Sequence, residues 1–509
     1  MFGHSADGDM IRIKIASPAS KTVRDLLKEK LDQLQCHFTW GPQKEIIDLD
    51  DMVYRLQDSI DLNLKYKARS YNQLAFVNCL QGNSEEAIQN LQEAEKILRE
   101  NHKDTFERRS IITYGNYAWV HYHMGELTKA QSYLDKLEII CKPLTDGPRY
   151  TAMIPEVYGE KGWSLLRSAA QHYEEAMECF EKALEEDPDN TEWIMGYATV
   201  LFRLESIPGT REKYKSSQCV NHLQRVLELD PDESLAMVML ALKLQQDNQK
   251  KEANELVERA LQKSPDVPKV LRNAAKFYRL ERAVEKAIEL LEKALGITPM
   301  NSVLHDQIGM CYRVQLLELF KNPLSSDPQY PEFQQKMVLI NHCKHHFGKA
   351  FEHRPKTATK SQLDYADICI RNGEYSDAAE VYSKLLKLEG IRPENMQKIY
   401  LQAGAFEMYR RKSDLNAVNL LQKGLKIKNN THDWKLCYKH LDKWVNRKLC
   451  RDAHNSKALG VKGFLYQMDG HKSEAIEYFE KALEFDPSNE EYLSALCELR
   501  LSFEEHHEL

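Results

Sequence analysis

Small and large apolar residues return at fixed distances along the chain. In the segment 274–299 five such positions stand at offsets 0, 12, 16, 19 and 24, namely Ala275, Ala287, Leu291, Ala294 and Pro299. The same series begins 34 residues earlier at Ala241, and complete or partial copies bring the number to about ten. This periodicity predicts two helices joined by a short turn. Small side chains at the first two offsets let the helices approach closely, and the proline ends the unit.

A single hairpin of this kind cannot bury its own apolar stripe, so successive copies have to stack. The period and the ladder resemble those of the tetratricopeptide repeat. We therefore predict an all-α fold, a tetratricopeptide-repeat superhelix (α-solenoid). The copies are unevenly spaced, and inserts near 204–218, 316–340 and 425–457 predict extra helices or long loops. We expect these interrupting non-repeat helices to enclose a basic groove.

The repeats also suggest how the chain is divided. We expect a flexible N-terminal extension over 1–27, N-terminal repeats over 28–260, a central repeat region lining the groove over 261–424, a basic helix with the terminal repeat over 425–502, and a tail over 503–509. Glycine and proline are scarce, with 21 and 17 of 509 residues. This scarcity favours helices with short connections over a β protein with many turns.

The composition narrows the function classes. The chain has 70 basic and 77 acidic residues and a formal net charge of −7, which excludes a wholly basic nucleic-acid coat but not a local basic groove. None of the eleven cysteines forms a C-x-x-C pair, which favours reduced thiols inside the cell. No apolar run reaches the length of a transmembrane helix. We expect a cytoplasmic protein.

Motifs for catalysis or a cofactor are missing from the sequence. It contains no P-loop, G-x-S-x-G, H-E-x-x-H or G-x-G-x-x-G pattern. His342 and His346 flank Cys343 with a spacing that a metal site can use, but Cys343 occupies the small inward position of its repeat. We expect no enzyme activity, no cofactor and no metal.

Four cations share one face of a predicted first helix: Lys269, Arg272, Lys276 and Arg279, at spacings of 3, 4 and 3. We call them the basic stripe, and their positions in the repeat are those that line the concave face. Like charges on one stripe repel, by about 0.2–0.5 kcal/mol for each neighbouring pair. An anionic ligand in the groove explains the stripe better than the alternative, an ordinary solvated face.

A second series of cations recurs every four residues in the 425–457 insert: Lys435, Lys439, Lys443, Arg447 and Arg451. Trp434 and Trp444 are interleaved with it, and we expect these tryptophans to seal the helix against the repeats. The cations either extend a track for phosphates or form a basic helix surface, and the sequence favours neither.

Several runs along the chain form a distinctive combination: LQCHFTW at 34–40, YGNYAWVHYHMG at 114–125, GEKGWSLL at 159–166, LRNAAKFYR at 271–279 and LHDQIGMCYRVQ at 304–315. These runs resemble hallmarks of the interferon-induced proteins with tetratricopeptide repeats. The resemblance covers nearly all of 28–502. It implies a cytosolic antiviral effector without catalytic activity. Such proteins hold the 5′ end of single-stranded viral RNA, triphosphorylated or with an incompletely methylated cap, in a pocket inside the superhelix and block its translation.

The resemblance carries phosphate and nucleotide contacts onto Arg167, Tyr173, Arg203, Arg272 and Gln307. Arg55 resembles an arginine of the cap-recognising members, and Trp163 resembles the tryptophan that stacks on the cap base. Together with the rest of the basic stripe and with Arg313, these are the residues predicted to bind RNA.

Some positions depart from the family pattern. Asn63 and Thr199 replace apolar residues of the cap pocket, and Asp306 replaces a histidine. The Tyr-x-x-x-Leu motif through which some members bind partners reads Phe479 to Leu483. An oligomer with a second copy or with a related repeat protein through the C-terminal repeat would keep this apolar contact.

The resulting hypothesis is a repeat protein that sequesters RNA by its 5′ end, accepts both a triphosphate and a cap, and binds a 5′-triphosphate more tightly than a 5′-hydroxyl. The rival hypothesis is a protein-interaction scaffold whose groove binds an acidic peptide. The two differ in salt dependence, since only the neutralisation of many phosphates makes binding fall steeply with salt.

Overall fold

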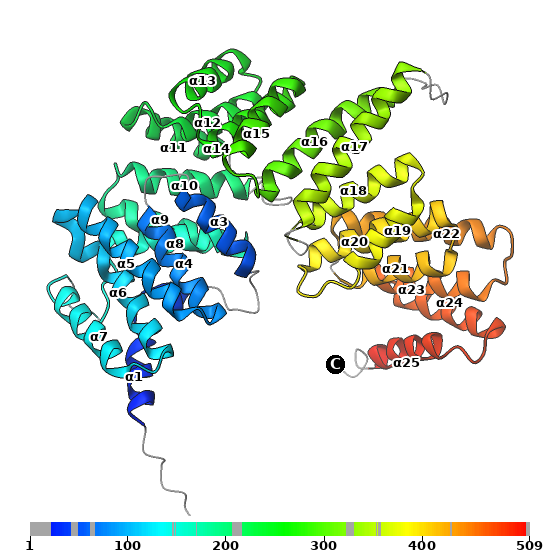
Figure 1. Ribbon diagram of the computed structural model, residues 1–509. Helices are drawn as coiled ribbons and strands as arrows, with labels where there is room; N and C mark the ends of the chain where they lie inside the picture. Colours follow the sequence, from blue (N-terminus) through cyan, green and yellow to red (C-terminus); the bar gives the residue numbers. More distant parts are fainter. Residues whose placement is uncertain are drawn as a thin grey trace, which may run out of the picture. The chain divides into compact units, whose positions relative to one another are not determined.

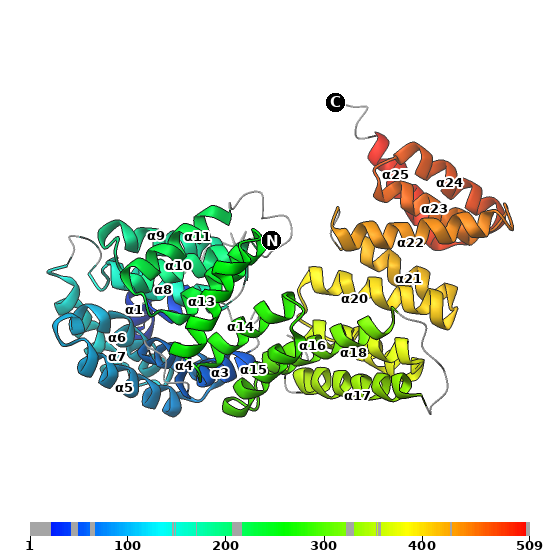
Figure 2. The ribbon, with the colours of Figure 1, turned by 90° about the horizontal axis from the view of Figure 1, so that it is seen from above.

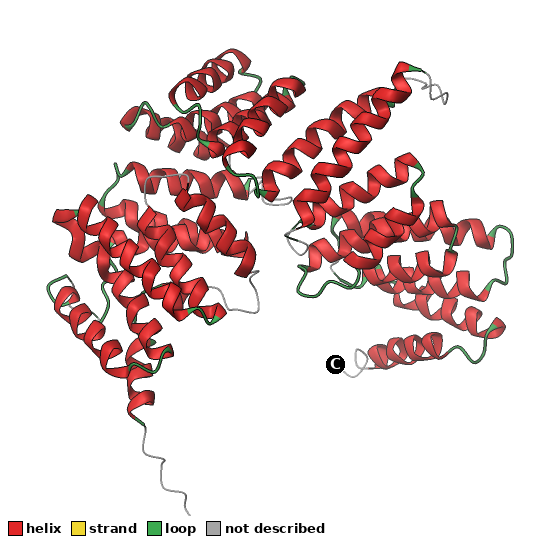
Figure 3. Ribbon diagram, viewed as in Figure 1, coloured by secondary structure: helices red, strands yellow, loops and turns green. Residues whose placement is uncertain are grey.

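The computed structural model describes residues 22–41, 49–61, 67–144, 147, 149–168, 170–205, 216–321, 330–352, 354, 358–427 and 430–504. Within these residues every regular element is a helix, and no strand occurs (Figure 3). The predicted all-α fold is confirmed. Across the same residues, no helix is both long enough and apolar enough to span a bilayer.

The chain forms two compact units, residues 1–270 and 271–509, and the division falls within α14 (Pro268–Leu280). The finer division expected from the sequence stays a prediction. In the first unit three helices come before the repeats: α1 (Val23–Leu31), α2 (His37–Trp40) and α3 (Leu49–Asp61). Five hairpins follow among the described residues: α4 (Lys67–Gln81) with α5 (Ser84–Asn101), α6 (Phe106–His123) with α7 (Leu127–Cys141), α8 (Pro155–Ser168) with α9 (Tyr173–Glu186), α10 (Thr191–Leu204) with α11 (Ser216–Leu229), and α12 (Ser234–Gln246) with α13 (Lys250–Lys263) (Figure 1).

The described part of the second unit continues the series from α14. Its hairpins pair α14 with α15 (Val284–Ile297), α16 (Ser302–Leu319) with α17 (Pro331–Glu352), α18 (Thr359–Asn372) with α19 (Tyr375–Leu385), α20 (Pro393–Phe406) with α21 (Asp414–Leu425), and α23 (Ser456–Met468) with α24 (Lys472–Phe485). From α15 onward each α-helix packs on the next in chain order, through to α25 (Glu490–Glu504) (Figure 2).

The three inserts are accommodated in different ways. The insert near 425–457 contains the predicted extra helix, α22 (His432–Leu449). Around 316–340 the hairpin itself is longer, with 18 residues in α16 and 22 in α17, and residues 322–329 lie outside the described part. Most of the insert near 204–218 also lies outside it.

Both ends of the helical part differ from the expected boundaries. Residues 1–21 of the expected extension lie outside the described residues. The Thr22 hydroxyl accepts a hydrogen bond from Asp25 N at 3.2 Å, and Thr22 N donates to Asp25 Oδ2 at 3.0 Å, so a capping box starts α1 at Val23. Leu27 and Leu31 are buried, so the folded part begins before residue 28. At the other end α25 continues to Glu504, past the expected start of the tail.

The LQCHFTW run fixes α2 against α6. The His37 side chain is buried, and its backbone N donates to Asn116 Oδ1 at 3.2 Å. The ring of Phe38 stacks on Trp119 with centroids 5.7 Å apart. A Cβ on Gly115 would lie 2.9 Å from Cys36 Cβ. The small Gly115 thus lets α2 approach α6 closely, and the aromatic side chains of the run pack between the two helices.

The hairpins close over small residues, as the ladder predicts. Phe180, Phe347 and Phe479 occupy the same position of three second helices, and each ring lies where a Cβ on a facing glycine would clash or nearly clash. These glycines are Gly162 and Gly196 for Phe180, Gly309 for Phe347 and Gly463 for Phe479. The missing side chain of each glycine makes room for the ring, so the packing density of the hairpin is kept.

Replacing Gly196 with alanine should destabilise the first unit, because the new methyl would lie 2.4 Å from the Phe180 ring. Overpacking of this kind costs about 1–3 kcal/mol. The matched control is Gly296→Ala in α15, where an added Cβ meets no atom within 4 Å and alanine favours the helix by up to about 1 kcal/mol. Urea unfolding should shift in opposite directions for the two variants, and equal shifts would contradict the close contact.

Candidate nucleic-acid interface

Three predicted arginines of the first unit meet at the C-terminal end of α8. Arg55 of α3 donates from Nη1 to the carbonyl oxygen of Arg167 at 3.3 Å. Arg203 of α10 donates to the carbonyl oxygen of Leu166 at 2.8 Å, and Arg167 itself donates to Ser70 Oγ at 3.3 Å. The last carbonyls of a helix lack partners within the helix and carry its negative dipole end, so cations gather there. We call Arg55, Arg167 and Arg203 the arginine cluster.

The positive charges of Arg167 and Arg203 are only partly compensated. Among the described residues, Arg167 and Arg203 donate only to neutral oxygens, of the backbone, Ser70 and Tyr173. Burial, together with the neighbouring Arg69, Arg203 and Arg55, lowers the pKa of the Arg167 guanidinium to about 9, although the charge of Glu160 acts in the opposite direction. A guanidinium stays charged at neutral pH, so the shift expresses the energetic cost of holding this cation among others. An anion placed here would relieve that cost.

Two predicted aromatic residues belong to the same region. Arg203 Nη1 lies 3.4 Å from the hydroxyl of Tyr173, the first residue of α9, and the Arg203 Cζ atom lies 5.6 Å from the ring centre. Trp163, one helical turn before Arg167, is half-buried. Its indole N–H is buried without a hydrogen-bond acceptor among the described residues. The structure therefore brings together five of the predicted site residues: Arg55, Trp163, Arg167, Tyr173 and Arg203.

Sequence reasoning missed Arg69, which lies next to Trp163. Arg69 is buried, pairs with Glu192 at 2.5 Å and lies over the Trp163 ring. The two members of this ion pair are 123 positions apart. No local pattern in the sequence connects them.

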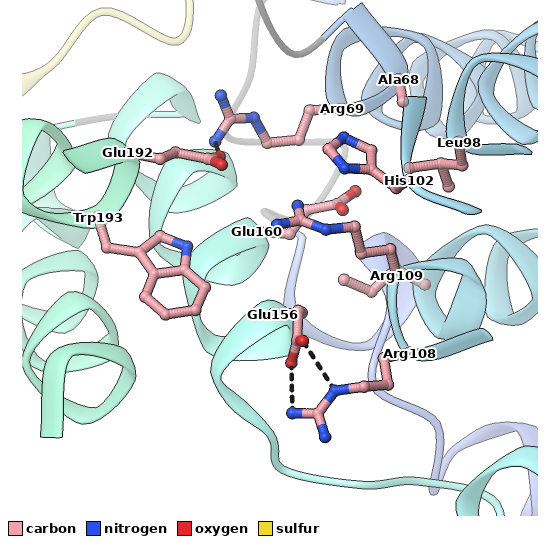
Figure 4. A pocket seen from close by; sticks show the side chains of 11 residues that line it. Ala68, Arg69, Leu98, His102, Arg108, Arg109, Glu156, Glu160, Glu192 and Trp193 are labelled. Atoms are coloured by element: carbon pink, nitrogen blue, oxygen red, sulfur yellow. Dashed lines mark hydrogen bonds and ion pairs between the residues drawn. The ribbon is translucent and has the colours of Figure 1, made fainter. Parts of the chain in front are cut away.

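A small polar cavity of about 40 Å³ lies beside this ion pair (Figure 4). Arg108 and Glu156 form a bidentate pair on its wall, at 2.8 and 3.0 Å. Glu160 also lines it and accepts a hydrogen bond from Asn72 at 2.9 Å. The cavity has room for a water molecule or two but not for a nucleotide.

The basic stripe lies on α14, as predicted. All four cations are half-buried, and their spacing places them on one face of the helix. Whether this face binds an anion is not decided by the helix alone, so the stripe stays a predicted site.

Gln307 and Arg313, predicted on α16, already have protein partners in the second unit. Gln307 donates to Asp306 at 3.1 Å. Arg313 lies 3.2 Å from a carboxylate oxygen of Asp367 and 3.9 Å from one of Asp364. An RNA phosphate at Arg313 would have to compete with two carboxylates.

The departures from the family pattern have structural consequences. Thr199 is buried, and its hydroxyl donates to the carbonyl oxygen of Met195 at 2.7 Å, so its polar group is satisfied within α10. Asp306 accepts a hydrogen bond from Ser361 at 2.8 Å and lies 3.9 Å from Lys360, which partly compensates its charge. Asn63 lies outside the described residues.

Four of the five cations of the 425–457 insert lie on the exposed side of α22, and Arg451 follows the end of that helix. Trp434 and Trp444 are buried in the core of the second unit, so the prediction that they seal the helix is confirmed. Lys435, Lys439 and Lys443 are exposed. Both interpretations of this basic face stay open.

The residues of the predicted partner motif point in part to the interior. Phe479 is 3% exposed, and its ring lies 6.1 Å from that of Tyr492 on α25. Leu483 is half-buried and packs on the same core. Phe479 is therefore a core residue of its own chain here, and a partner would meet Leu483 first.

One group of side chains among the described residues has the spacing of a metal site: Cys369, Glu374 and Asp377. Lys344 Nζ lies 2.8 Å from Glu374 and 3.3 Å from Asp377, so an ammonium group already neutralises both carboxylates. Burial raises the pKa of the Cys369 thiol to about 12, which disfavours the thiolate that a metal needs. The ring of His342 stacks on that of Tyr312, with centroids 4.4 Å apart.

Comparisons with known proteins agree with the repeat assignment. Models of the tetratricopeptide repeat match residues 66–140, 155–190 and 456–489, and a model described as Psidin, N-terminal TPR repeats region, matches residues 202–321. The human protein "Antiviral innate immune response effector IFIT1" is 39% identical over 458 residues, which cover 90% of this chain and 95% of that protein.

Two solved structures are similar over nearly the same length. The "Human IFIT1 dimer with m7Gppp-AAAA" aligns with a TM-score of 0.75 and 38% identity, and the "Human IFIT1 dimer with PPP-AAAA" with a TM-score of 0.73 and 36% identity. Each alignment covers 90% of this chain and 99% of the other.

Glu160 should make folding stability depend on pH. Burial raises its pKa from 4.5 to about 7, although the hydrogen bond from Asn72 and the charges of Arg69 and Arg109 act in the opposite direction. The folded state thus holds this proton more tightly than the unfolded chain, so stability falls as pH rises from about 4.5 to about 7. Glu160→Gln keeps an oxygen for Asn72 and cannot ionise.

Relative to wild type, Glu160→Gln should therefore gain on the order of 2 kcal/mol between acidic and mildly basic pH. Urea unfolding at a series of pH values measures the gain. Glu85→Gln, which changes an exposed carboxylate on α5, serves as the control. A stability difference that does not change with pH would contradict the assignment.

Proposed function

Because the chain belongs to the family of interferon-induced proteins with tetratricopeptide repeats, we propose that it binds the 5′ end of single-stranded RNA, with the arginine cluster as the site of the end phosphates. The observation that carries the proposal is the incomplete compensation of Arg167 and Arg203, which donate to neutral oxygens among the described residues. A phosphate adds an opposite charge and can accept two parallel hydrogen bonds from one guanidinium, which a neutral oxygen does not. A 5′ phosphate group therefore gains more at this cluster than the neutral acceptors do.

Two solved IFIT1 complexes, with m7Gppp-AAAA and with PPP-AAAA, indicate the ligand classes to consider. Both ligands carry several phosphates at the 5′ end. Tyr173 and Trp163 lie beside the cluster and offer aromatic faces, and base stacking on such faces adds about 1–3 kcal/mol per base. The basic stripe on α14 is a separate predicted site for RNA phosphates.

In the cell the protein would act as a non-enzymatic antiviral effector of the cytoplasm. It would hold viral RNA with a triphosphate or an incompletely methylated cap by the 5′ end and compete with translation factors for that end. Capture by stoichiometric binding needs no catalytic group. Assembly with a second copy or a related repeat protein is part of the same proposal, since the IFIT1 structures are titled as dimers.

End recognition can be tested at Arg203. In competition titrations with one RNA sequence, wild type should prefer a 5′-triphosphate over a 5′-hydroxyl by at least about tenfold, the worth of a charge-assisted hydrogen bond or two. Arg203→Ala should remove most of this preference. Arg225→Ala, which changes an exposed arginine paired with Asp189 and Glu228, should leave it intact. If wild type binds both ends alike, end recognition is wrong even where RNA binding survives.

The basic stripe can be tested through salt. If each of its four cations neutralises one phosphate, they should contribute about −0.7 × 4 to the slope of log K for RNA binding against log salt. This contribution corresponds to a roughly 50-fold loss of affinity between about 50 and 200 mM salt. Arg272→Glu should remove most binding and flatten the slope. Lys263→Glu changes an exposed lysine paired with Asp232 and is the control. Equal small losses from the two variants would favour a solvated stripe and with it the acidic-peptide scaffold.

A further inference from the structure

One face of the Trp163 indole is covered by a cation of the same chain. The Cζ atom of Arg69 lies 4.7 Å from the centre of the Trp163 ring, within the range of a cation–π contact. The ring of Phe180 packs against Trp163 edge to face, with centroids 5.4 Å apart and an interplanar angle of 79°. A base that stacks on Trp163 needs a face of this ring, and Arg69 occupies one.

Glu192 holds Arg69 in this position. Arg69 Nη1 lies 2.5 Å from Glu192 Oε1, and the two side chains are 9% and 10% exposed. Glu192 belongs to the first turn of α10, where the helix dipole favours a carboxylate. In a buried pair, removing one charge leaves the other uncompensated. A base that displaces Arg69 from the indole would therefore lose binding free energy that it would keep on an uncovered ring.

We propose that Arg69 is a specificity-determining residue that excludes a 7-methylguanosine cap from Trp163, so that of the two end groups named in the proposed function the site takes the 5′-triphosphate. The inference rests on the proposed function, because it concerns the end group that the same site accepts. A 7-methylguanine base carries a positive charge, so the guanidinium both occupies a stacking face and repels the base.

The same cation has the opposite effect on a triphosphate. Among the neighbouring cations that lower the pKa of Arg167, Arg69 acts most strongly, so its field adds to that of the arginine cluster. A triphosphate is attracted by this field and needs no aromatic face. Arg69 thus discriminates between RNA with a 5′-triphosphate and RNA with a 7-methylguanosine cap, although both carry a chain of phosphates.

Competition titrations with one RNA sequence bearing PPP, Gppp or m7Gppp measure this selectivity. Wild type should bind PPP-RNA at least about tenfold more tightly than m7Gppp-RNA, with the uncharged Gppp base in between. The double variant Arg69→Ala/Glu192→Gln removes both charges of the pair. Its affinity for m7Gppp-RNA should rise at least about fivefold, and adding Trp163→Ala should cancel that gain.

Arg108→Ala is the matched control, since Arg108 lies on the wall of the same cavity and is also ion-paired (Figure 4). It should leave the ratio of m7Gppp to PPP affinity unchanged. Arg69→Lys keeps a positive charge within reach of Glu192 and should keep rejecting m7Gppp-RNA. This variant and the wild-type ratio decide the question where circular dichroism shows that the double variant does not fold.

The outcomes separate this inference from the proposed function. Equal wild-type affinity for m7Gppp-RNA and PPP-RNA, or a wild-type ratio retained by a folded double variant, would overturn the role of Arg69 while 5′-end binding stands. Equal wild-type affinity for PPP-RNA and for the same RNA with a 5′-hydroxyl would instead refute the proposed function.

Discussion

The ring of Phe180 fixes the two helices that carry most of the arginine cluster. A Cβ on Gly162 of α8 would lie 3.0 Å from this ring, and one on Gly196 of α10 would lie 2.4 Å from it. Both helices are thus held by backbone-to-ring contact, which leaves little freedom to rotate or slide. Arg167 follows Gly162 by five residues and Arg203 follows Gly196 by seven. The positions of the cluster's charges therefore depend on a contact made entirely of apolar groups.

Rigid placement matters because the cluster is held against its own repulsion. Arg55 and Arg203 cap the last carbonyls of α8, so the negative end of that helix supplies part of the compensation. A helix terminus offers only about half a unit charge, against the two guanidinium groups of Arg167 and Arg203, which donate to neutral oxygens among the described residues. An anionic ligand would supply further compensation. Preorganised cations of this kind bind an anion without the reorganisation that flexible side chains would require.

The sequence predicts the hairpins, and it identifies the residues that meet at the end of α8, because both signals are local. The ladder of small residues repeats within about 34 residues. The run GEKGWSLL, one of those that carry the family resemblance, contains Trp163 itself. The failures involve partners far apart in the chain. Arg69 with Glu192, and Arg313 with Asp364 and Asp367, form pairs that arise only when the hairpins stack. The early start of α1 is a different case, since the capping box of Thr22 and Asp25 was readable from the sequence.

The local positive field persists in a chain of net charge −7 because each nearby carboxylate is already engaged or partly protonated. Glu192 is paired with Arg69, and Glu156 with Arg108. Glu160, whose pKa is raised by burial to about 7, carries only part of a negative charge near neutral pH. Acidic residues on distant surfaces lie beyond the Debye length of about 8 Å at physiological salt and do not screen the site. The average charge of the chain therefore gives little information about the sign of the ligand, which the pairing around α8 determines.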